Sequence, residues 1–411
     1  MSVQKQNKKN RNLKIMKTIF VATCLFGLEK FLGQEIDALG LKRIDTIDGR
    51  VTFEGEMNDV ARLNINLRCA ERVYIKVGSF EARTFTELFD GTAALPWEDY
   101  IGRADAFPVK GHSPKSLLTS IPDCQSIVKK AIVKRLSSKY GIEWFEESGT
   151  KYQIEFFIFK DVATLMIDTS GTPLHKRGYR TEAGAAPLRE TLAAAMVLTS
   201  RLREDTLLWD PFCGSGTIAI EAAMIMSGIA PGASRGFAAQ AFPFIDANAW
   251  QDAFEQARAN IKTDTVFEAY ASDTDREVLE IAKQNAARAG VENRIKFFLA
   301  DARKIEKPDR RGTIICNPPY GERLMTPEQV KSLYSEIGKN FASFAPWQIY
   351  VLTSCEDFER YYGAYADRKK KLYNGMIECE LYQYFKPIDR KQTSFSKDER
   401  SYHDRQRRFK K

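Results

Sequence analysis

The sequence predicts an α/β fold in which a seven-stranded, doubly wound sheet follows a smaller α+β region. Three observations indicate this class. From residue 207 onward, short apolar strands alternate with helical segments, which is typical of a parallel sheet covered by helices. The strand at 207–210 runs into a Gly-Ser-Gly turn that opens a helix. Residues 371–385 contain Asn374-Gly375, a turn signal that predicts an antiparallel hairpin at the end of the sheet.

The region before residue 170 has a β-α-β-β-like start, typical of a small α+β unit. Asp48-Gly49 predicts a hairpin turn, and Gly40 ends the helix before it. The first half is predicted to contain a strand at 18–24, a helix at 28–39, a hairpin at 44–53, a helix at 57–67 and a strand at 72–77. After residues 85–100, the second half is predicted to contain a strand at 106–110, a helix at 123–140 and strands at 151–159 and 162–168.

The helix at 123–140 has an apolar side and a basic side. The basic side carries Lys129, Lys130, Lys134 and Arg135. Such a face suits either RNA phosphates or simple solvation, and the sequence leaves both open.

Residues 170–180 are rich in glycine and charge, which predicts a linker or a lid rather than a core element. We expect its basic side chains Lys176, Arg177 and Arg180 to contact RNA. Beyond it, the sequence predicts helices at 188–202 and 328–344 and strands at 267–272, 294–300 and 348–352.

The net charge of +8 is concentrated at the two ends of the chain. Residues 1–17 carry six basic residues and no acidic one, and residues 386–411 carry ten basic against four acidic residues. Each tail therefore contributes +6, so the remainder carries −4. Basic tails bind phosphates in a salt-dependent way, or they solubilise a disordered end. No stretch resembles a membrane span or a signal peptide, and scattered cysteines suit a reducing cytoplasm, where we expect the protein to work.

The Gly-Ser-Gly turn is a candidate cofactor site. Gly214, Gly216 and Ala219 match the loose pattern G-x-G-x-x-A, in which glycine lets the backbone approach a ligand closely. Exposed N–H groups at the following helix start favour polar or anionic ligand atoms. Asp210 at the strand end would repel the pyrophosphate of a nicotinamide dinucleotide, but it can meet the ammonium and sulfonium groups of S-adenosylmethionine.

The next two strands also end in carboxylates that suit this cofactor. Asp273 can accept hydrogen bonds from the ribose hydroxyls, and Asp301 from an adenine amino group. The alternative role of each carboxylate is a helix cap, and this alternative carries more weight for Asp275 than for Asp273 or Asp301. Asp273 lies much farther past the glycines than the usual spacing of about 20 residues. We therefore interpret 227–264 as an insertion that packs beside the sheet.

The strand that ends at Cys316 leads into Asn317-Pro318-Pro319-Tyr320. An exocyclic base amine is a poor nucleophile because its lone pair is delocalised into the ring. The Asn317 side-chain oxygen and the Pro318 carbonyl can each accept one amine hydrogen, while the prolines hold both acceptors rigid. Tyr320 can stack on a base turned out of its helix. Cofactor turn and motif together predict methylation of an exocyclic amine; a plain proline turn with a buried tyrosine is the alternative.

Two cysteines lie near this predicted site. Cys213 and Cys316 have no nearby histidine that could activate a thiol, so we interpret them as structural. The seven cysteines lack paired C-x-x-C spacing and the three histidines are scattered, so no metal site is predicted.

The chain resembles the THUMP-domain RNA methyltransferases, specifically the bacterial group that includes the N-terminal half of the 23S ribosomal RNA guanine-N2 methyltransferase. The resemblance covers about residues 16–386 and is carried by segments 167–171, 174–180, 186–193, 210–217, 317–323 and 371–377. It implies a basic extension (1–15), a ferredoxin-like subdomain (16–70), a THUMP RNA-binding domain (71–167), a Rossmann-like class I methyltransferase domain (168–386) and a basic tail (387–411).

The resemblance also implies residue roles. Its pattern places the glycine turn, Asp273 and Asp301 at S-adenosylmethionine, and the segment around Tyr179, Arg180 and Pro187 at the methionine end of that cofactor. The cofactor-binding residues we predict are Asp210, Gly214, Ser215, Gly216, Thr217, Asp273, Thr274, Asp301, Ala302 and Pro187. The catalytic residues we predict are Asn317, Pro318, Pro319 and Tyr320.

The leading hypothesis is methylation of guanine N2 in 23S ribosomal RNA, either free or in a ribosomal assembly particle, with no membrane and no metal involved. Adenine N6 methylation of RNA or DNA is the alternative, because the Asn-Pro-Pro-Tyr motif serves both amines. Three further alternatives are disfavoured. The RNA-type front half opposes protein glutamine methylation, intact motifs oppose a role in RNA binding alone, and Asp210 and the terminal hairpin oppose a nicotinamide oxidoreductase.

Overall fold

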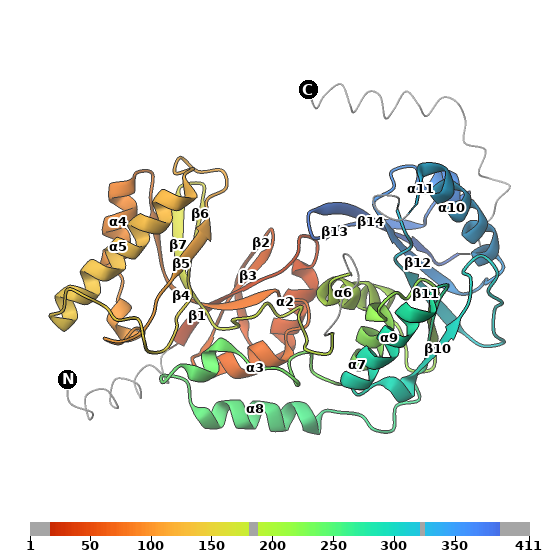
Figure 1. Ribbon diagram of the computed structural model, residues 1–411, viewed down its shortest axis with the longest axis horizontal. Coiled ribbons are helices and arrows are strands. Elements are labelled where there is room, and N and C mark those ends of the chain that lie inside the picture. Colours follow the sequence, from red (N-terminus) through yellow and green to blue (C-terminus); the bar gives the residue numbers. More distant parts are fainter. Residues whose placement is uncertain (1–16, 181–187, 321–324, 387–411) are drawn as a thin grey trace. The chain divides into compact units, whose positions relative to one another are not determined.

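The computed structural model describes residues 17–180, 188–320 and 325–386, which form two compact units (Figure 1). The N-terminal unit comprises residues 1–179 together with 228–263. The C-terminal unit comprises residues 180–227 together with 264–411. Within the described ranges, no helix is long and apolar enough to cross a membrane.

The described part of the N-terminal unit is built on one sheet with the strand order β2-β3-β1-β4-β7-β6-β5. The strands are β1 (Lys17–Thr23), β2 (Lys42–Ile47), β3 (Arg50–Glu56), β4 (Arg72–Glu81), β5 (Val109–His112), β6 (Ile154–Phe159) and β7 (Val162–Asp168). The helices are α2 (Glu29–Ala38), α3 (Asp59–Asn66), α4 (Phe85–Ala94), η1 (Trp97–Asp99), α5 (Ile121–Tyr140), η2 (Ala238–Ala241) and α8 (Ala247–Ala259). The sheet runs unbroken through both predicted subdomains, because the long strand β4 pairs with β1 on one side and β7 on the other.

The two faces of this sheet differ in what they bury. Phe20, Phe53 and Ile75 lie opposite one another on one face and are fully buried. Helices α2 to α5 pack against the strands of this sheet (Figure 1). The other face carries only a small apolar cluster, which includes Tyr74 and Met166. The predicted hairpin at Asp48-Gly49 is confirmed, with φ +77° at the glycine.

The insertion after α7 packs elsewhere than the sequence analysis expected. Residues 228–263 belong to the N-terminal unit, where α8 packs against α3. The Asp246 N–H donates to Asn58 Oδ1 at 3.0 Å, and the Gly232 N–H donates to the Ile65 carbonyl at 2.9 Å. The prediction that this segment packs beside the C-terminal sheet is therefore wrong.

The described part of the C-terminal unit contains the predicted doubly wound sheet, with the order β10-β9-β8-β11-β12-β14-β13. The strands are β8 (Leu207–Asp210), β9 (Ala269–Asp273), β10 (Ile295–Leu299), β11 (Gly312–Cys316), β12 (Gln348–Thr353), β13 (Arg368–Asn374) and β14 (Ile377–Tyr384). The helices are α6 (Glu190–Ser200), α7 (Thr217–Met226), α9 (Arg276–Arg288), η3 (Glu292–Arg294), α10 (Pro327–Ala342) and α11 (Phe358–Tyr362). Strands β8 to β12 are parallel, and β14 is antiparallel to both β12 and β13, which confirms the predicted terminal hairpin.

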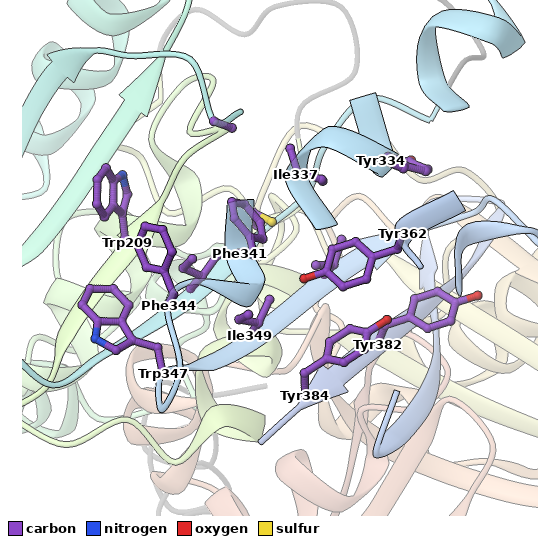
Figure 2. Packing of buried hydrophobic residues seen from close by; sticks show 14 of the residues in the cluster. Trp209, Tyr334, Ile337, Phe341, Phe344, Trp347, Ile349, Tyr362, Tyr382 and Tyr384 are labelled. Carbon is purple, nitrogen blue, oxygen red and sulfur yellow. The ribbon is translucent and has the colours of Figure 1, made fainter. Parts of the chain in front are cut away.

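An aromatic core lies between α10 and the strands β11, β12 and β14. Figure 2 shows Phe344 next to Trp209 and Trp347 at one end of this core, and Tyr362, Tyr382 and Tyr384 gathered at the other. Tyr334 is completely buried in the same cluster. This core supports the carboxyl ends of β8 and β11, where the predicted cofactor turn and Asn-Pro-Pro-Tyr turn begin.

Candidate active site

The turn between β8 and α7 has the backbone conformation that its glycines predict. Gly214 and Gly216 have φ angles of +51° and +85°, and Gly216 is the N-cap of α7. A Cβ atom on Gly216 would lie 3.1 Å from the Cβ of Ala282, whereas a Cβ on Gly214 would point into open space. Gly216 therefore allows close packing on α9, and Gly214 leaves room for a ligand.

Three hydrogen bonds from the neighbouring strand and helix fix this turn. Asp273 Oδ2 accepts from the Gly214 N–H at 3.0 Å, and the Cys213 N–H donates to the Ser272 carbonyl at 3.0 Å. The fully buried Asn285 donates from Nδ2 to the Ser215 carbonyl at 3.0 Å. Asp273 thus orders the cofactor turn itself. Asn285 was not among the predicted residues, because nothing in its local sequence distinguishes it from other helix positions.

Asp210 at the end of β8 is 1% exposed and accepts a hydrogen bond from the Phe212 N–H at 3.2 Å. Burial raises the pKa of the Asp210 carboxyl well above its ordinary value, and the nearby Asp273 carboxylate adds to the rise. The Phe212 N–H opposes it. A cationic ligand near this carboxyl would stabilise its charged form. The ammonium and sulfonium groups of S-adenosylmethionine meet that requirement, whereas a pyrophosphate does not.

Arg180 belongs to the C-terminal unit and is bonded at the start of α7. Its guanidinium donates to the Thr217 hydroxyl and to the Leu188 carbonyl, and it lies 3.6 Å from Glu190 Oε1. The side chain is only 10% exposed. The role beside the cofactor that the resemblance implies for Arg180 stays a prediction, and this internal pairing leaves little of the guanidinium for the expected RNA contact. Pro187, predicted to bind the cofactor, lies outside the described residues.

The carboxylates beyond β9 and β10 have different partners. Asp275 accepts from the N–H groups of Glu277 and Val278, so its interpretation as a helix cap is confirmed. Asp301 accepts from the Arg303 side chain through both oxygens, and this contact lowers the pKa of the Asp301 carboxyl.

The roles predicted for Asp301 and its neighbours concern the adenosine end of the cofactor. The Asp301 side chain is 24% exposed, so a carboxylate lone pair beside the Arg303 contacts could accept from an adenine amino group. Ala302 is buried and Thr274 is exposed, and their predicted cofactor contacts stay predictions.

The Asn-Pro-Pro-Tyr turn follows β11, which lies beside β8 in the sheet. Asn317 Oδ1 is buried and has no hydrogen-bond partner among the residues that the structure describes. The Pro319 carbonyl accepts from the Tyr334 hydroxyl at 2.9 Å, and that hydroxyl lies 2.9 Å from Thr353 Oγ1. The core therefore holds the turn, while its asparagine oxygen has no partner among the described residues.

Tyr320, at the end of this turn, is held by the terminal hairpin. Its hydroxyl accepts a hydrogen bond from Asn374 Nδ2 at 3.0 Å. Asn374 was predicted only as part of a hairpin turn, and Tyr334 only lay within the helix predicted at 328–344. Both residues have a second role that local sequence patterns do not reveal, because the contact joins segments far apart in the chain.

Cys213 and Cys316 are buried, and burial raises the pKa of each thiol well above its ordinary value. A thiol with a raised pKa is a poor nucleophile, which agrees with the structural interpretation. Within the described residues, no group of three or more histidine, cysteine, aspartate or glutamate side chains could hold a metal ion.

The basic residues predicted to contact RNA fall into two groups. Lys130, Lys134 and Lys176 are exposed. The other four make internal contacts. Arg180 is described above, Lys129 contacts Glu147, Arg135 contacts Glu98, and Arg177 contacts the Leu174 and Arg68 carbonyls. Arg177 is 2% exposed, so its guanidinium holds the linker and the expected RNA contact is not available to it.

The fold and the site define a class I methyltransferase that uses S-adenosylmethionine. The glycine turn, the buried Asp210 and the adjoining Asn-Pro-Pro-Tyr turn fit a cofactor that supplies an electrophilic methyl group. The chain belongs to the family of RMKL-like methyltransferases, whose domain matches residues 177–383. Residues 19–74 match the RlmL ferredoxin-like domain and residues 82–168 match the THUMP domain. The individual domain boundaries given above stay predictions.

Two curated relatives illustrate this membership. The chain is 42% identical over 375 residues to YpsC of Bacillus subtilis, named as a candidate RNA methyltransferase, with 90% of this chain and 97% of that protein covered. It is 35% identical over 379 residues to the ribosomal RNA large subunit methyltransferase K/L of Psychromonas ingrahamii, with 90% of this chain and 50% of that protein covered. The chain thus spans about half the length of the K/L enzyme.

Two solved structures share the fold over nearly the whole chain. A protein of Listeria monocytogenes named as a predicted N6-adenine-specific DNA methylase has a TM-score of 0.85 at 44% identity, covering 94% of this chain and 99% of that one. SMU.472, a methyltransferase candidate complexed with SAH, has a TM-score of 0.85 at 41% identity, covering 90% of this chain and 98% of that one.

Proposed function

We propose that this protein transfers a methyl group from S-adenosylmethionine to the exocyclic N2 amine of a guanine in 23S ribosomal RNA. An RNA substrate is supported by the names of YpsC and of the K/L enzyme, and by the THUMP and ferredoxin-like domains that precede the methyltransferase domain.

The observation that carries this proposal is the buried Asn317 Oδ1 without a described partner. Leaving such an acceptor unpaired costs about 1–3 kcal/mol. An amine hydrogen of the target base would satisfy it. The acceptor follows β11, which is the immediate neighbour of the strand that leads into the cofactor turn. This adjacency supports in-line transfer between a bound cofactor and a bound amine.

In the proposed reaction, Asn317 Oδ1 and the Pro318 carbonyl accept the two amine hydrogens. Both hydrogen bonds favour a pyramidal nitrogen whose lone pair points at the methyl carbon. Tyr320 stacks on the extruded base. The carbon–nitrogen bond forms as the carbon–sulfur bond breaks, S-adenosylhomocysteine is the leaving group, and the methylated amine loses one proton to water. Neither Cys213 nor Cys316 is required.

The test is transfer of labelled methyl groups to 23S RNA from cells that lack this gene, followed by nucleoside analysis of the RNA. We expect N2-methylguanosine with the wild-type protein. Asn317→Ala should lower the rate by about 100-fold or more, because it removes an acceptor used in the transition state. Asn248→Ala, an exposed site on α8, is the matched control and should leave the rate unchanged. Absence of transfer to 23S RNA would contradict the proposal.

Adenine N6 methylation of RNA or DNA is the second candidate. The same two acceptors serve an adenine amine, and the structurally similar Listeria monocytogenes protein carries an N6-adenine name. Appearance of N6-methyladenosine in place of N2-methylguanosine would establish this alternative.

The proposal places the enzyme in the cytoplasm, with free ribosomal RNA or an assembly particle as its partner. All seven cysteines of the chain are free thiols, which supports a reducing compartment. The exposed Lys130 and Lys134 on α5 support binding of RNA phosphates.

A further inference from the structure

The N-terminal sheet contains a polar pocket of about 300 Å³, well removed in sequence from the methyltransferase motifs. The side chains that matter for its chemistry are Arg50, Tyr74, Lys110, Glu155, Phe157 and Met166. None of these residues was singled out by the sequence analysis, and the proposed methyl transfer does not use them.

The register of the strands explains how these side chains meet. Lys110 lies opposite Glu155, and Glu155 lies opposite Met166, so the three share one face of the sheet. Arg50 comes from β3, which is separated from β6 by β1, β4 and β7. Its guanidinium carbon nevertheless lies 3.3 Å from the centre of the Phe157 ring on β6. Strands are spaced about 4.8 Å apart, so this contact requires a strongly curved sheet. The pocket is the hollow of that curve.

Two polar groups in this hollow are incompletely paired among the described residues. Arg50 Nε is buried and has no hydrogen-bond partner. Glu155 is 7% exposed, and its Oε2 makes no hydrogen bond, although Lys110 Nζ lies 3.4 Å away. Its other oxygen lies 3.9 Å from His112 Nε2. A ligand that offers N–H donors to the carboxylate and an acceptor to the guanidinium would recover free energy from both groups.

Burial acts on the two groups in opposite directions. It lowers the pKa of Arg50 to about 10 and raises the pKa of Glu155, while Lys110 and His112 limit the rise at Glu155. Both shifts mean that the charged forms are under-solvated. Hydrogen bonds from a ligand would stabilise these charged forms.

We propose that this pocket binds one unstacked guanine nucleotide of the RNA substrate. Arginine planes and aromatic rings are common stacking platforms for unstacked RNA bases, and Arg50 on Phe157 forms such a platform. Guanine presents two adjacent N–H donors on its Watson–Crick edge, which match the two oxygens of Glu155. Adenine and cytosine present one amino group there, and uracil presents one imide N–H. Lys110, with a side chain 40% exposed, is placed to meet the phosphate.

The inference rests on the proposed RNA substrate, and it gives the enzyme a second recognition point apart from the target amine. An RNA that binds both this pocket and the Asn-Pro-Pro-Tyr turn would be recognised partly through a guanine that is not itself methylated. The specificity of the enzyme would then depend on the N-terminal unit as well as on the Asn-Pro-Pro-Tyr turn.

The test measures fluorescence anisotropy of labelled five-nucleotide RNAs with the full chain. UUGUU should bind about tenfold more tightly than UUAUU, UUCUU or UUUUU, since a matched base edge contributes that much discrimination. Glu155→Gln and Arg50→Met should abolish the preference. Glu81→Gln and Arg83→Met, exposed positions at the end of β4, are the matched controls and should preserve it. Equal binding of all four RNAs, or an unchanged preference in both pocket variants, would overturn the proposal.

Two further measurements separate the possible failures. UUGUU that carries 5-iodouridine next to the guanine should cross-link to a peptide that contains Phe157 or Tyr74. This measurement uses the wild-type protein, so it does not depend on whether the variants fold. A cross-link to other peptides would overturn the proposal. Free GMP should compete at least tenfold less well than UUGUU, and equal competition would overturn the assignment to RNA. Methyl transfer to 23S RNA is scored separately, so guanine-selective binding without transfer would reject only the proposed function.

Discussion

Replacing Tyr334 with phenylalanine tests whether the aromatic core holds the Asn-Pro-Pro-Tyr turn in its working position. The Tyr334 hydroxyl donates to the Pro319 carbonyl and lies 2.9 Å from Thr353 Oγ1. The Tyr334 ring packs edge-on to the Phe358 ring, with 5.0 Å between the ring centroids, and it would stay in place after the substitution. The substitution therefore removes one oxygen atom and the hydrogen bonds that it makes, with little change in packing.

The expected magnitude follows from those two contacts. Each hydrogen bond contributes about 1 kcal/mol, and the Pro319 carbonyl is left without this donor, so the C-terminal unit should lose about 2–3 kcal/mol. For a unit of this size, the thermal midpoint should fall by about 4–10 °C. The loosened turn should also displace Asn317, which should lower kcat by about tenfold or more. The KM for S-adenosylmethionine should change less than about twofold, because the cofactor turn has separate hydrogen bonds.

Calorimetry and single-turnover methyl transfer to undermethylated 23S RNA measure these quantities. Tyr361→Phe is the matched control, since its hydroxyl contacts Asp357 at 3.3 Å on the surface, and it should cost less than about 0.5 kcal/mol. A Tyr334→Phe protein with the wild-type midpoint and the wild-type kcat would refute the idea that the core positions the turn.

Three other predictions concern the same site. Asn374→Ala removes the hydrogen-bond donor to the Tyr320 hydroxyl, so kcat/KM for RNA should fall about tenfold. The affinity for the cofactor, measured by calorimetry, should be unchanged. Equal losses in both quantities would contradict the idea that Asn374 positions the Tyr320 ring. Gly216→Ala should lower the free energy of unfolding by about 1–2 kcal/mol, because Gly216 has φ +85° and its new Cβ would lie 3.1 Å from the Cβ of Ala282 on α9. Gly290→Ala, at φ +70° with open space around it, should lower the thermal midpoint less. The reverse order in thermal melts would be inconsistent with the packing. Iodoacetamide at pH 8 should label Cys213 in the folded protein at less than about a tenth of the rate in the unfolded chain, because burial raises the pKa of the Cys213 thiol. Mass spectrometry measures the extent of labelling, and equally rapid labelling of the folded protein would disprove this prediction.

Local signals predicted most of the fold correctly. Asp48-Gly49 and Asn374-Gly375 both mark hairpins in the structure, and Asp275 caps α9 as interpreted. These features depend on a few consecutive residues, so sequence patterns contain the needed information. The alternation of strands and helices predicted the parallel C-terminal sheet and its terminal hairpin, whereas the order of its strands came from the structure.

Features that depend on distant contacts were harder to predict. The break in spacing predicted an insertion at 227–264, but composition did not show that residues 228–263 belong to the N-terminal unit, where α8 packs against α3. The positive charge of Arg177 suggested RNA, yet its guanidinium satisfies two carbonyls inside the N-terminal unit. Charge is visible in a sequence, whereas burial of that charge is decided by packing.

The composition of the two units from separate chain segments constrains how this protein can be dissected or recombined. The chain passes between the units three times, at 179/180, 227/228 and 263/264. A single cut anywhere in the chain therefore cannot yield both units complete. Exchange of the N-terminal unit between relatives would need matching junctions at all three of these positions. A recombination event with a single crossover would therefore produce a unit assembled from two parents. Inheritance of the N-terminal unit and the C-terminal unit is thereby coupled.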